Sequence, residues 1–242
     1  MIPKKLHLCW LSGDKYPDKI AYCISTWKKY LPDYEIVLWD LNKVDFNKLL
    51  WVKHAYEHKK YSYACDYLRA YALYTEGGIY MDSDVEVLKS FNDLLNLPYF
   101  LCREKSGKLE PAIMGAEPGM VLMKKVVNYY DNKSFVKEDG TLDLKTLPDI
   151  ITEIAEANYE VRDIDNPSKI TLDEKSLFIL PAEYFSPKRN DTFEVEQTSN
   201  TYTIHHFTAT WFLPKQKFFR FISQYFGFKF AVTLSNLVKK LW

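Results

Sequence analysis

The first forty residues alternate between strand-like and helix-like patterns, and this order constrains the fold more than any other feature of the sequence. Residues 5–11 alternate in polarity and predict a strand, which the polar turn at 12–14 ends. Residues 20–30 predict a helix closed by Pro32, and residues 34–39 predict a second strand. Because a helix commonly connects parallel strands, we expect an α/β domain with a Rossmann-like sheet.

The later elements are expected to extend this sheet and to cover it. A helix over 63–76, capped by Ser62 and stopped by Gly77, leads into a short buried strand over 78–81. Prolines interrupt the stretch 160–200, which we therefore expect to be irregular. The other predicted elements, some of which make the sheet mixed, are helices over 47–60, 119–130 and 145–158 and strands over 85–87, 99–103, 112–116 and 202–204.

The composition is typical of a globular protein, with 47% apolar and 26% charged residues. The four cysteines show no metal-binding spacing, which indicates a reduced, cytoplasmic chain. Lys4 and Lys5 interrupt the short apolar run at the N-terminus, so we expect no signal peptide. No uncharged apolar stretch is long enough to cross a membrane.

A net charge of zero hides a basic C-terminal end. Residues 197–242 contain six Lys or Arg and no Asp or Glu, and apolar residues recur there at helical spacing from Phe218 onward. A basic, aromatic, amphipathic helix suits an anionic membrane surface, so we expect residues 215–242 to contact one. A helical hairpin packed on the core, or a dimer contact, would explain the same pattern, and the oligomeric state stays open.

Two carboxylates stand one residue apart in Asp82-Ser83-Asp84, directly after the predicted strand 78–81. In open α/β sheets, ligands bind outside the carboxyl ends of the strands. Paired acids at such a position suit a hard divalent cation that also binds a diphosphate. A solvated turn with two acids would give the same short motif.

Asp66 and Arg69 lie on the helix before this motif, three residues apart and therefore on one helical face. They would form a weak surface ion pair if the face were exposed. Placed one helix before the acid pair, they are also candidates for binding the same ligand as Asp82 and Asp84.

These motifs together resemble the "DXD" sugar-binding region of a glycosyltransferase family. The resemblance rests on residues 65–69 (Cys-Asp-Tyr-Leu-Arg) and 77–84 (Gly-Gly-Ile-Tyr-Met-Asp-Ser-Asp), and it continues through residues 2–13, 27–39 and 205–211. The family, glycosyltransferase family 32-like, includes yeast-type initiating α-1,6-mannosyltransferases and bacterial capsular polysaccharide transferases. It is distantly similar to the glucosylating domain of large clostridial toxins.

The resemblance implies a GT-A-type catalytic domain over residues 1–213, followed by the basic tail 214–242. It also implies a nucleotide-sugar donor, Mn²⁺ or Mg²⁺, and retention of the anomeric configuration. Trp10, with Leu11 beside it, would stack on the nucleobase, although a buried core Trp is an equal alternative from the sequence alone. Trp211 would close over the donor diphosphate and exclude water.

The resemblance assigns further roles around the acid pair. Asp66 and Arg69 would hold hydroxyls of the donor sugar, and Tyr80 would line the same pocket. Asp82 would reach the ribose and the metal, and Asp84 would be the direct metal ligand.

Two adjacent histidines follow the last predicted strand, and their side chains must point to opposite sides. We expect His205 to contact the metal or diphosphate, with His206 as the second choice. Many relatives carry Asn in the strand before the helix 119–130, whereas residues 110–115 of this chain contain none. That Asn would contact the sugar or the nucleophile region, and Glu110 is a candidate to take its place.

The expected function is transfer of a hexose, with a UDP-sugar as the first donor and GDP-mannose as the second. The acceptor expected from the bacterial relatives is a glycan or lipid-linked oligosaccharide of capsular polysaccharide biosynthesis, at the inner face of the membrane. We expect no nucleic-acid partner. Two alternatives stay open: an aspartyl-phosphate-type phosphatase that uses Asp82 as its nucleophile, and a non-catalytic module that binds glycans or membranes.

Overall fold

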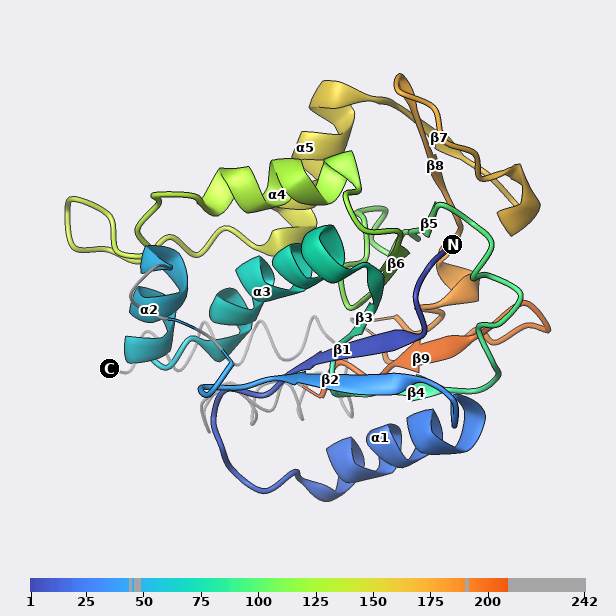
Figure 1. The fold of residues 1–242 in the computed structure, drawn as a ribbon, viewed down its shortest axis with the longest axis horizontal. Helices are drawn as coiled ribbons and strands as arrows, with labels where there is room; N and C mark the ends of the chain where they lie inside the picture. The colour runs from blue at the N-terminus through green and yellow to red at the C-terminus, as the bar shows by residue number, and fades with distance from the viewer. Residues whose placement is uncertain (44, 46–48, 190–191, 209–242) are drawn as a thin grey trace.

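The computed structural model describes residues 1–43, 45, 49–189 and 192–208 of the 242-residue chain. A five-stranded sheet forms its centre, with the strand order β2-β1-β3-β6-β5 (Figure 1). β1 (Lys5–Cys9) pairs in parallel with β2 (Glu35–Trp39) and with β3 (Gly78–Met81). β6 (Ile113–Ala116) is antiparallel to β3 and to β5 (Tyr99–Phe100). The α/β class and the mixed central sheet, expected for a GT-A-type domain, are confirmed.

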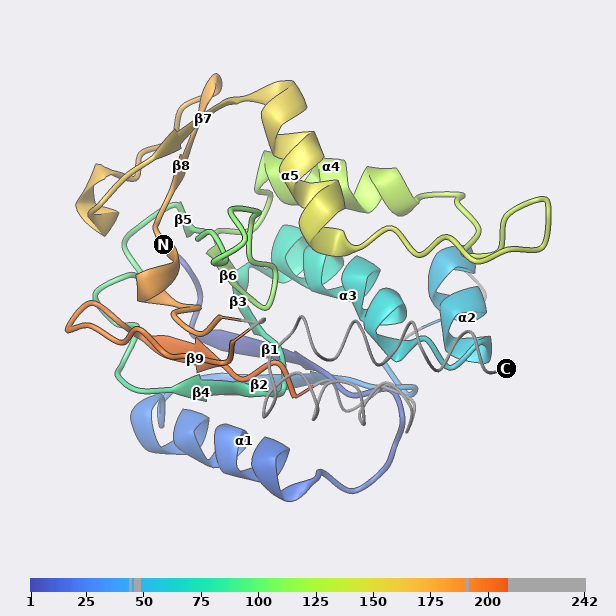
Figure 2. The ribbon, with the colours of Figure 1, turned by 180° about the vertical axis from the view of Figure 1, so that it is seen from behind.

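Helices cover both faces of this sheet. α1 (Asp18–Tyr30) lies on one face, and α3 (Tyr61–Glu76) and α4 (Val121–Tyr130) lie on the other, as Figures 1 and 2 show. α2 (Leu50–Glu57) packs against α3, and α5 (Leu147–Asn158) packs against α4. The apolar side chains between these layers form one continuous buried core.

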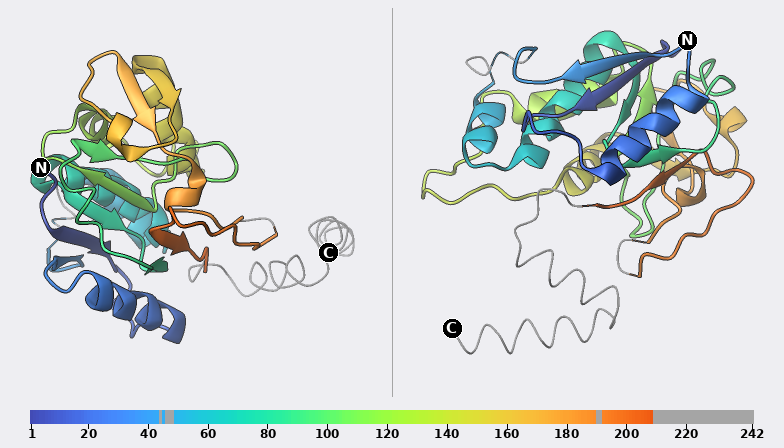
Figure 3. Two further views of the ribbon diagram at one scale, coloured as in Figure 1. Left: turned by 90° about the vertical axis from the view of Figure 1, so that its right-hand side faces the viewer. Right: turned by 90° about the horizontal axis from the view of Figure 1, so that it is seen from below.

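Two smaller sheets flank the central one. β4 (Val85–Val87) and β9 (Thr203–His205) are antiparallel, and β7 (Glu160–Asp163) and β8 (Ser176–Ile179) are parallel. The left view of Figure 3 shows β7 and β8 in gold and orange at the top of the molecule, away from β1. The prediction of an irregular stretch over 160–200 was therefore wrong at these two strands. Most side chains of β7 are exposed, so its sequence lacks the apolar alternation that marks a half-buried strand.

The ends of α3 differ in how well the sequence predicted them. The Ser62 cap was wrong: Lys60 is the N-cap, its carbonyl accepts from the N–H groups of Tyr63 and Ala64, and Ser62 lies inside the helix. Gly77 ends the helix as predicted, with φ 63°. A Cβ atom there would lie 2.6 Å from Pro118, which is too close for any other residue.

None of the helices in the described part of the chain has both the length and the hydropathy that a membrane span requires. The predicted basic tail, residues 214–242, lies outside the described residues.

Candidate active site

The site lies at the edge of the sheet where β1 and β3 end. Trp10 follows β1 and Asp82 follows β3, and these strands are parallel, so both residues emerge at the same edge. β6 is antiparallel to β3, so its beginning meets the same edge, where the Asp82 N–H donates to the Ala112 carbonyl at 2.8 Å. The segment that leads into β6 therefore lies at the same sheet edge as the residues that follow β1 and β3.

Three potential metal ligands converge at this edge. One ligand atom each from Asp82, Asp84 and His205 lies within 4.8 Å of the other two. Asp84 precedes β4, and the pairing of Val85 with His205 places the imidazole beside it, with Nε2 3.5 Å from Asp84 Oδ1. Two carboxylates and one imidazole are a donor set that can hold a divalent metal ion.

The two adjacent histidines have different partners. His205 faces the acid pair and is buried, whereas His206 turns away and contacts Glu86 Oε2 through Nε2 at 2.6 Å. The structure thus brings the first-choice histidine into the site and places the second choice outside it.

Charge at His205 is balanced by carboxylates on both sides of the ring. Burial opposes protonation, but Glu110 and Asp84 outweigh it and raise the pKa of His205 well above its usual range. Burial would raise the pKa of Asp84, yet His205 and two hydrogen bonds from Thr208 lower it overall. Thr208 donates to Asp84 Oδ2 from its backbone N–H at 2.7 Å and from its hydroxyl at 3.0 Å.

Arg69 joins the helix motif to the acid pair. Its Nη2 lies 3.3 Å from Asp66 Oδ1 and 3.3 Å from Asp82 Oδ1, and its Nη1 donates to the Pro111 carbonyl at 3.0 Å. Tyr80 stacks under the guanidinium at 4.7 Å and donates its hydroxyl to Asp82 Oδ1 at 2.7 Å. Asp66 and Arg69 are only 7% and 5% exposed, so this is a buried pair and not a surface ion pair.

Burial raises the pKa values of two carboxyl groups in this cluster, which favours their protonated, neutral form. It raises the pKa of Asp66 to about 7, against the opposing effect of Arg69. It also raises the pKa of Asp82, against the effects of Arg69 and His205. Carboxyl groups with such shifted pKa values in a cleft are typical of functional sites.

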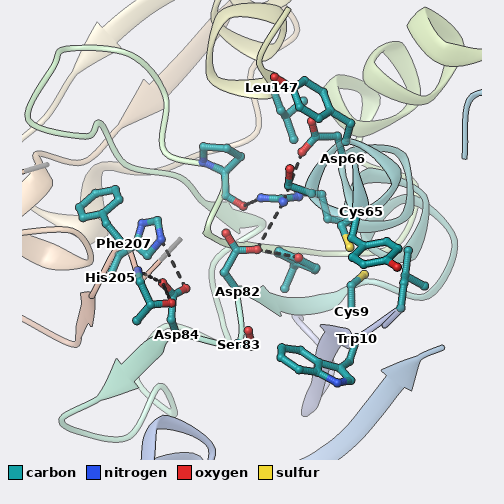
Figure 4. A pocket seen from close by; sticks show the side chains of 18 of the residues that line it. Cys9, Trp10, Cys65, Asp66, Asp82, Ser83, Asp84, Leu147, His205 and Phe207 are labelled. Atoms are coloured by element: carbon teal, nitrogen blue, oxygen red, sulfur yellow. Dashed lines mark hydrogen bonds and ion pairs between the residues drawn. The ribbon is translucent and has the colours of Figure 1, made fainter. Parts of the chain in front are cut away.

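A cavity of about 650 Å³ connects these groups. Figure 4 shows Asp82 near its centre, with Trp10 and Asp66 on different sides of it and His205 and Phe207 opposite Trp10. Apart from the second choice His206, the predicted site residues in the described part of the chain line it: Trp10, Leu11, Asp66, Arg69, Tyr80, Asp82, Asp84 and His205. Trp211 lies outside the described residues. A volume of this size is within the usual range for small-molecule sites.

Trp10 is half-buried at the wall of the cavity and is not a fully buried core residue. Its Nε1 donates to the Asp14 carbonyl at 2.7 Å, and its ring meets Tyr16 edge-on with centroids 4.9 Å apart. The turn at 12–14 therefore fixes the indole at the rim.

The structure adds lining residues that the sequence did not single out. Glu104 and Lys108 lie on the loop before β6, and Phe207 and Thr208 follow β9. Phe207 has a φ of 53°, which is rare for a residue with a Cβ atom, and its ring lies 3.9 Å from that of His205. The sequence alone assigned none of these four residues a role, because the pairing of distant strands brings them to the cavity.

Comparison with known proteins identifies the region that carries the site. Residues 17–101 match the glycosyltransferase sugar-binding region containing the DXD motif. The chain is 26% identical over 246 residues to inositol phosphoceramide mannosyltransferase 3 of Schizosaccharomyces pombe, covering 96% of this chain and 66% of the relative. It is 27% identical over 125 residues to the subversion of eukaryotic traffic protein A of Legionella pneumophila, covering 40% of this chain and 19% of that protein.

Among solved structures, PaToxG glycosyltransferase is similar with a TM-score of 0.45 and 20% identity, over 63% of this chain and 68% of the other. The chain spans less than two thirds of the length of both curated relatives. The match to the DXD sugar-binding region includes Asp66, Arg69, Tyr80, Asp82 and Asp84, which line the cavity.

Proposed function

We propose that this chain is a glycosyltransferase that transfers a hexose from a nucleotide sugar to a glycan or lipid-linked acceptor and depends on Mn²⁺ or Mg²⁺. The observation that carries the proposal is the convergence of Asp82, Asp84 and His205 within 4.8 Å at a cavity of about 650 Å³. A bound cation would neutralise the charge that develops on the departing diphosphate. These three residues would hold it.

In this proposal, Asp66 and Arg69 bind the hydroxyls of the donor sugar. Arg69 already binds Asp66, Asp82 and the Pro111 carbonyl, so its guanidinium is fixed before a ligand arrives. A fixed, buried donor–acceptor pair binds sugar hydroxyls without a further loss of side-chain entropy. Trp10 is assigned to the nucleobase, because its ring is held at the rim and stacking tolerates different bases.

Retention of configuration is part of the proposal, because the family that the sequence resembles transfers sugars with retention. Asp66 and Asp82 share Arg69, which leaves neither as an unpaired base for the acceptor hydroxyl. In the reaction that we propose, the bond from the anomeric carbon to the phosphate oxygen breaks and a bond to the acceptor oxygen forms on the same face. The acceptor proton passes to the leaving phosphate oxygen.

The relatives direct the choice of substrates to test. The name of the fungal relative specifies mannose and a ceramide-linked inositol phosphate, so GDP-mannose and lipid-linked acceptors belong in the test beside UDP-glucose and UDP-galactose. Our first donor is still a UDP-sugar. A role in capsular polysaccharide synthesis, with the basic residues 215–242 on an anionic membrane, is part of the proposal and rests on the sequence.

The experiment is a panel of UDP- and GDP-sugars incubated with the protein and Mn²⁺, with free nucleotide as the readout. We expect one donor to release nucleotide, release to stop in EDTA, and added Mn²⁺ to restore it. Release that is unaffected by EDTA would contradict the metal role. The match to the DXD region favours a glycosyltransferase over the phosphatase, which would instead release phosphate from a generic phosphoester.

A further inference from the structure

Glu110 is a buried carboxylate that the proposed transfer reaction does not use. It is 3% exposed and lies directly before Pro111, on the segment that leads into β6. Although it lines the cavity, both of its oxygens are occupied by the protein. Because both oxygens already have protein partners, Glu110 is a poor candidate for the sugar contact that its position in the sequence suggested.

The partners of Glu110 show that it accepts at both oxygens. Oε1 accepts from the Ala112 N–H at 3.0 Å, and Oε2 accepts from the Ser186 hydroxyl at 2.7 Å. Oε2 also lies 3.2 Å from Nδ1 of His205. Because these oxygens act as acceptors, the His205 contact requires a proton on Nδ1.

This hydrogen bond settles which nitrogen of His205 faces the acid pair. With Nδ1 committed to Glu110, Nε2 is the nitrogen left to bind a cation, and it is the one 3.5 Å from Asp84 Oδ1. Metal-binding histidines usually donate their other ring N–H to a carboxylate or carbonyl, which fixes the orientation of the ring.

We propose that Glu110, anchored by Ser186, is a positioning residue that aims Nε2 of His205 at the cation. Glu110 joins three segments that are far apart in the sequence: the segment before β6, the segment after η2 (Ala182–Tyr184), and the end of β9. The inference rests on the proposed metal site.

The neighbouring histidine, His206, provides a matched control. Glu86 Oε2 contacts Nε2 of His206 at 2.6 Å, so Glu86→Gln changes a carboxylate–histidine pair of the same kind that lies outside the site. The experiment compares Glu110→Gln with Glu86→Gln by titrating Mn²⁺ into each protein in the presence of UDP and measuring free Mn²⁺ by electron paramagnetic resonance. Circular dichroism melting reports the fold of each variant.

We expect Glu110→Gln to bind Mn²⁺ about 10- to 100-fold more weakly than the wild type, and Glu86→Gln to bind it as the wild type does. At saturating Mn²⁺, the ¹⁴N modulation from a coordinated imidazole is expected in the wild type and in Glu86→Gln. It should be reduced in Glu110→Gln and absent in His205→Ala, a difference that a purely structural role would not produce.

A folded Glu110→Gln protein with wild-type affinity would overturn the inference, and so would an equal loss in both glutamine variants. If Glu110→Gln does not fold, Ser186→Ala removes one anchor of the carboxylate and keeps the His205 contact. It should still weaken Mn²⁺ binding, and unchanged binding would count against the proposal. A wild-type protein that binds no Mn²⁺ would instead refute the metal role in the proposed function.

Discussion

The Trp39 indole donates its Nε1–H to Nδ1 of His7 at 3.1 Å, across the pair of strands β1 and β2. Nε2 of His7 then donates to the Gly77 carbonyl at 2.7 Å. Both contacts require the neutral ring with its proton on Nε2, since Nδ1 must accept. This buried histidine therefore ties β2 to the turn that leads into the strand before Asp82.

The first prediction concerns stability against pH. Burial lowers the pKa of His7, although the hydrogen bond to Gly77 opposes this. The unfolded chain thus binds the proton more tightly than the folded chain. The stability from the neutral ring is complete above about pH 6.5 and falls as the pH drops toward the folded-state pKa, by at most about 1.4 kcal/mol per pH unit.

The measurement is thermal unfolding between pH 8 and pH 5 for the wild type and His7→Gln. Gln does not titrate, so its melting temperature should be lower at pH 8 but should fall less on acidification. Parallel curves for the two proteins would show that His7 is not the group responsible.

The second prediction concerns the acid pair. Asp84→Asn keeps an oxygen that accepts from Thr208 but removes the negative charge that faces His205. We expect donor turnover to fall by about 100-fold or more, equivalent to about 2.7 kcal/mol, with a folded protein by circular dichroism. Turnover assays over a range of Mn²⁺ concentrations measure the effect. Retained turnover in this variant would contradict the role of Asp84 as a metal ligand.

The third prediction separates stability from activity at Asp66. Burial raises its pKa to about 7, so its contribution to stability is present at low pH and is lost as the pH rises through about 7. At pH 8, Asp66→Asn removes a buried charge while Arg69 keeps Asp82 as a partner. We expect an unchanged or higher melting temperature and a turnover about 10-fold lower, the effect of one lost hydrogen bond to a charged group.

A large drop in melting temperature for Asp66→Asn at pH 8 would mean that the buried ion pair is stabilising. Thr75→Ala, on the exposed side of the same helix, is the control for general effects on α3 and should change neither quantity strongly.

The fourth prediction concerns the nucleobase. Trp10→Ala removes a ring that is half-buried at the cavity rim, so its effect should fall on the donor KM more than on stability. Base–aromatic stacking is worth about 1–3 kcal/mol, which is about 5- to 150-fold in affinity. Steady-state kinetics with Trp10→Phe as an intermediate should rank wild type, Phe and Ala in that order. A large loss of stability with unchanged KM would mark Trp10 as a packing residue.

Much of the site could be predicted because it follows from local patterns. The short buried strand before Asp82 and the helical spacing of Asp66 and Arg69 are both readable within a few residues. The parallel order of the first strands then places the ends of β1 and β3 at one edge. The chemistry of the acid pair follows from this placement.

The parts of the site that could not be predicted depend on the pairing of strands that are far apart in the sequence. Adjacent histidines must face opposite ways, but only the register of Val85 against His205 decides which one meets the acids. Glu110 lies 95 residues before His205, and the antiparallel direction of β6 brings it there. Strand β7 escaped prediction because its exposed side chains carry no apolar period, and without this partner the short run of β8 was not recognised as a strand.

Asp84 uses its two oxygens for different partners: Oδ1 faces His205, while Oδ2 accepts both hydrogen bonds from Thr208. A cation that bound at Oδ1 would leave both hydrogen bonds from Thr208 in place. One side chain would then serve the ligand and also anchor the first residues of the segment that leaves β9.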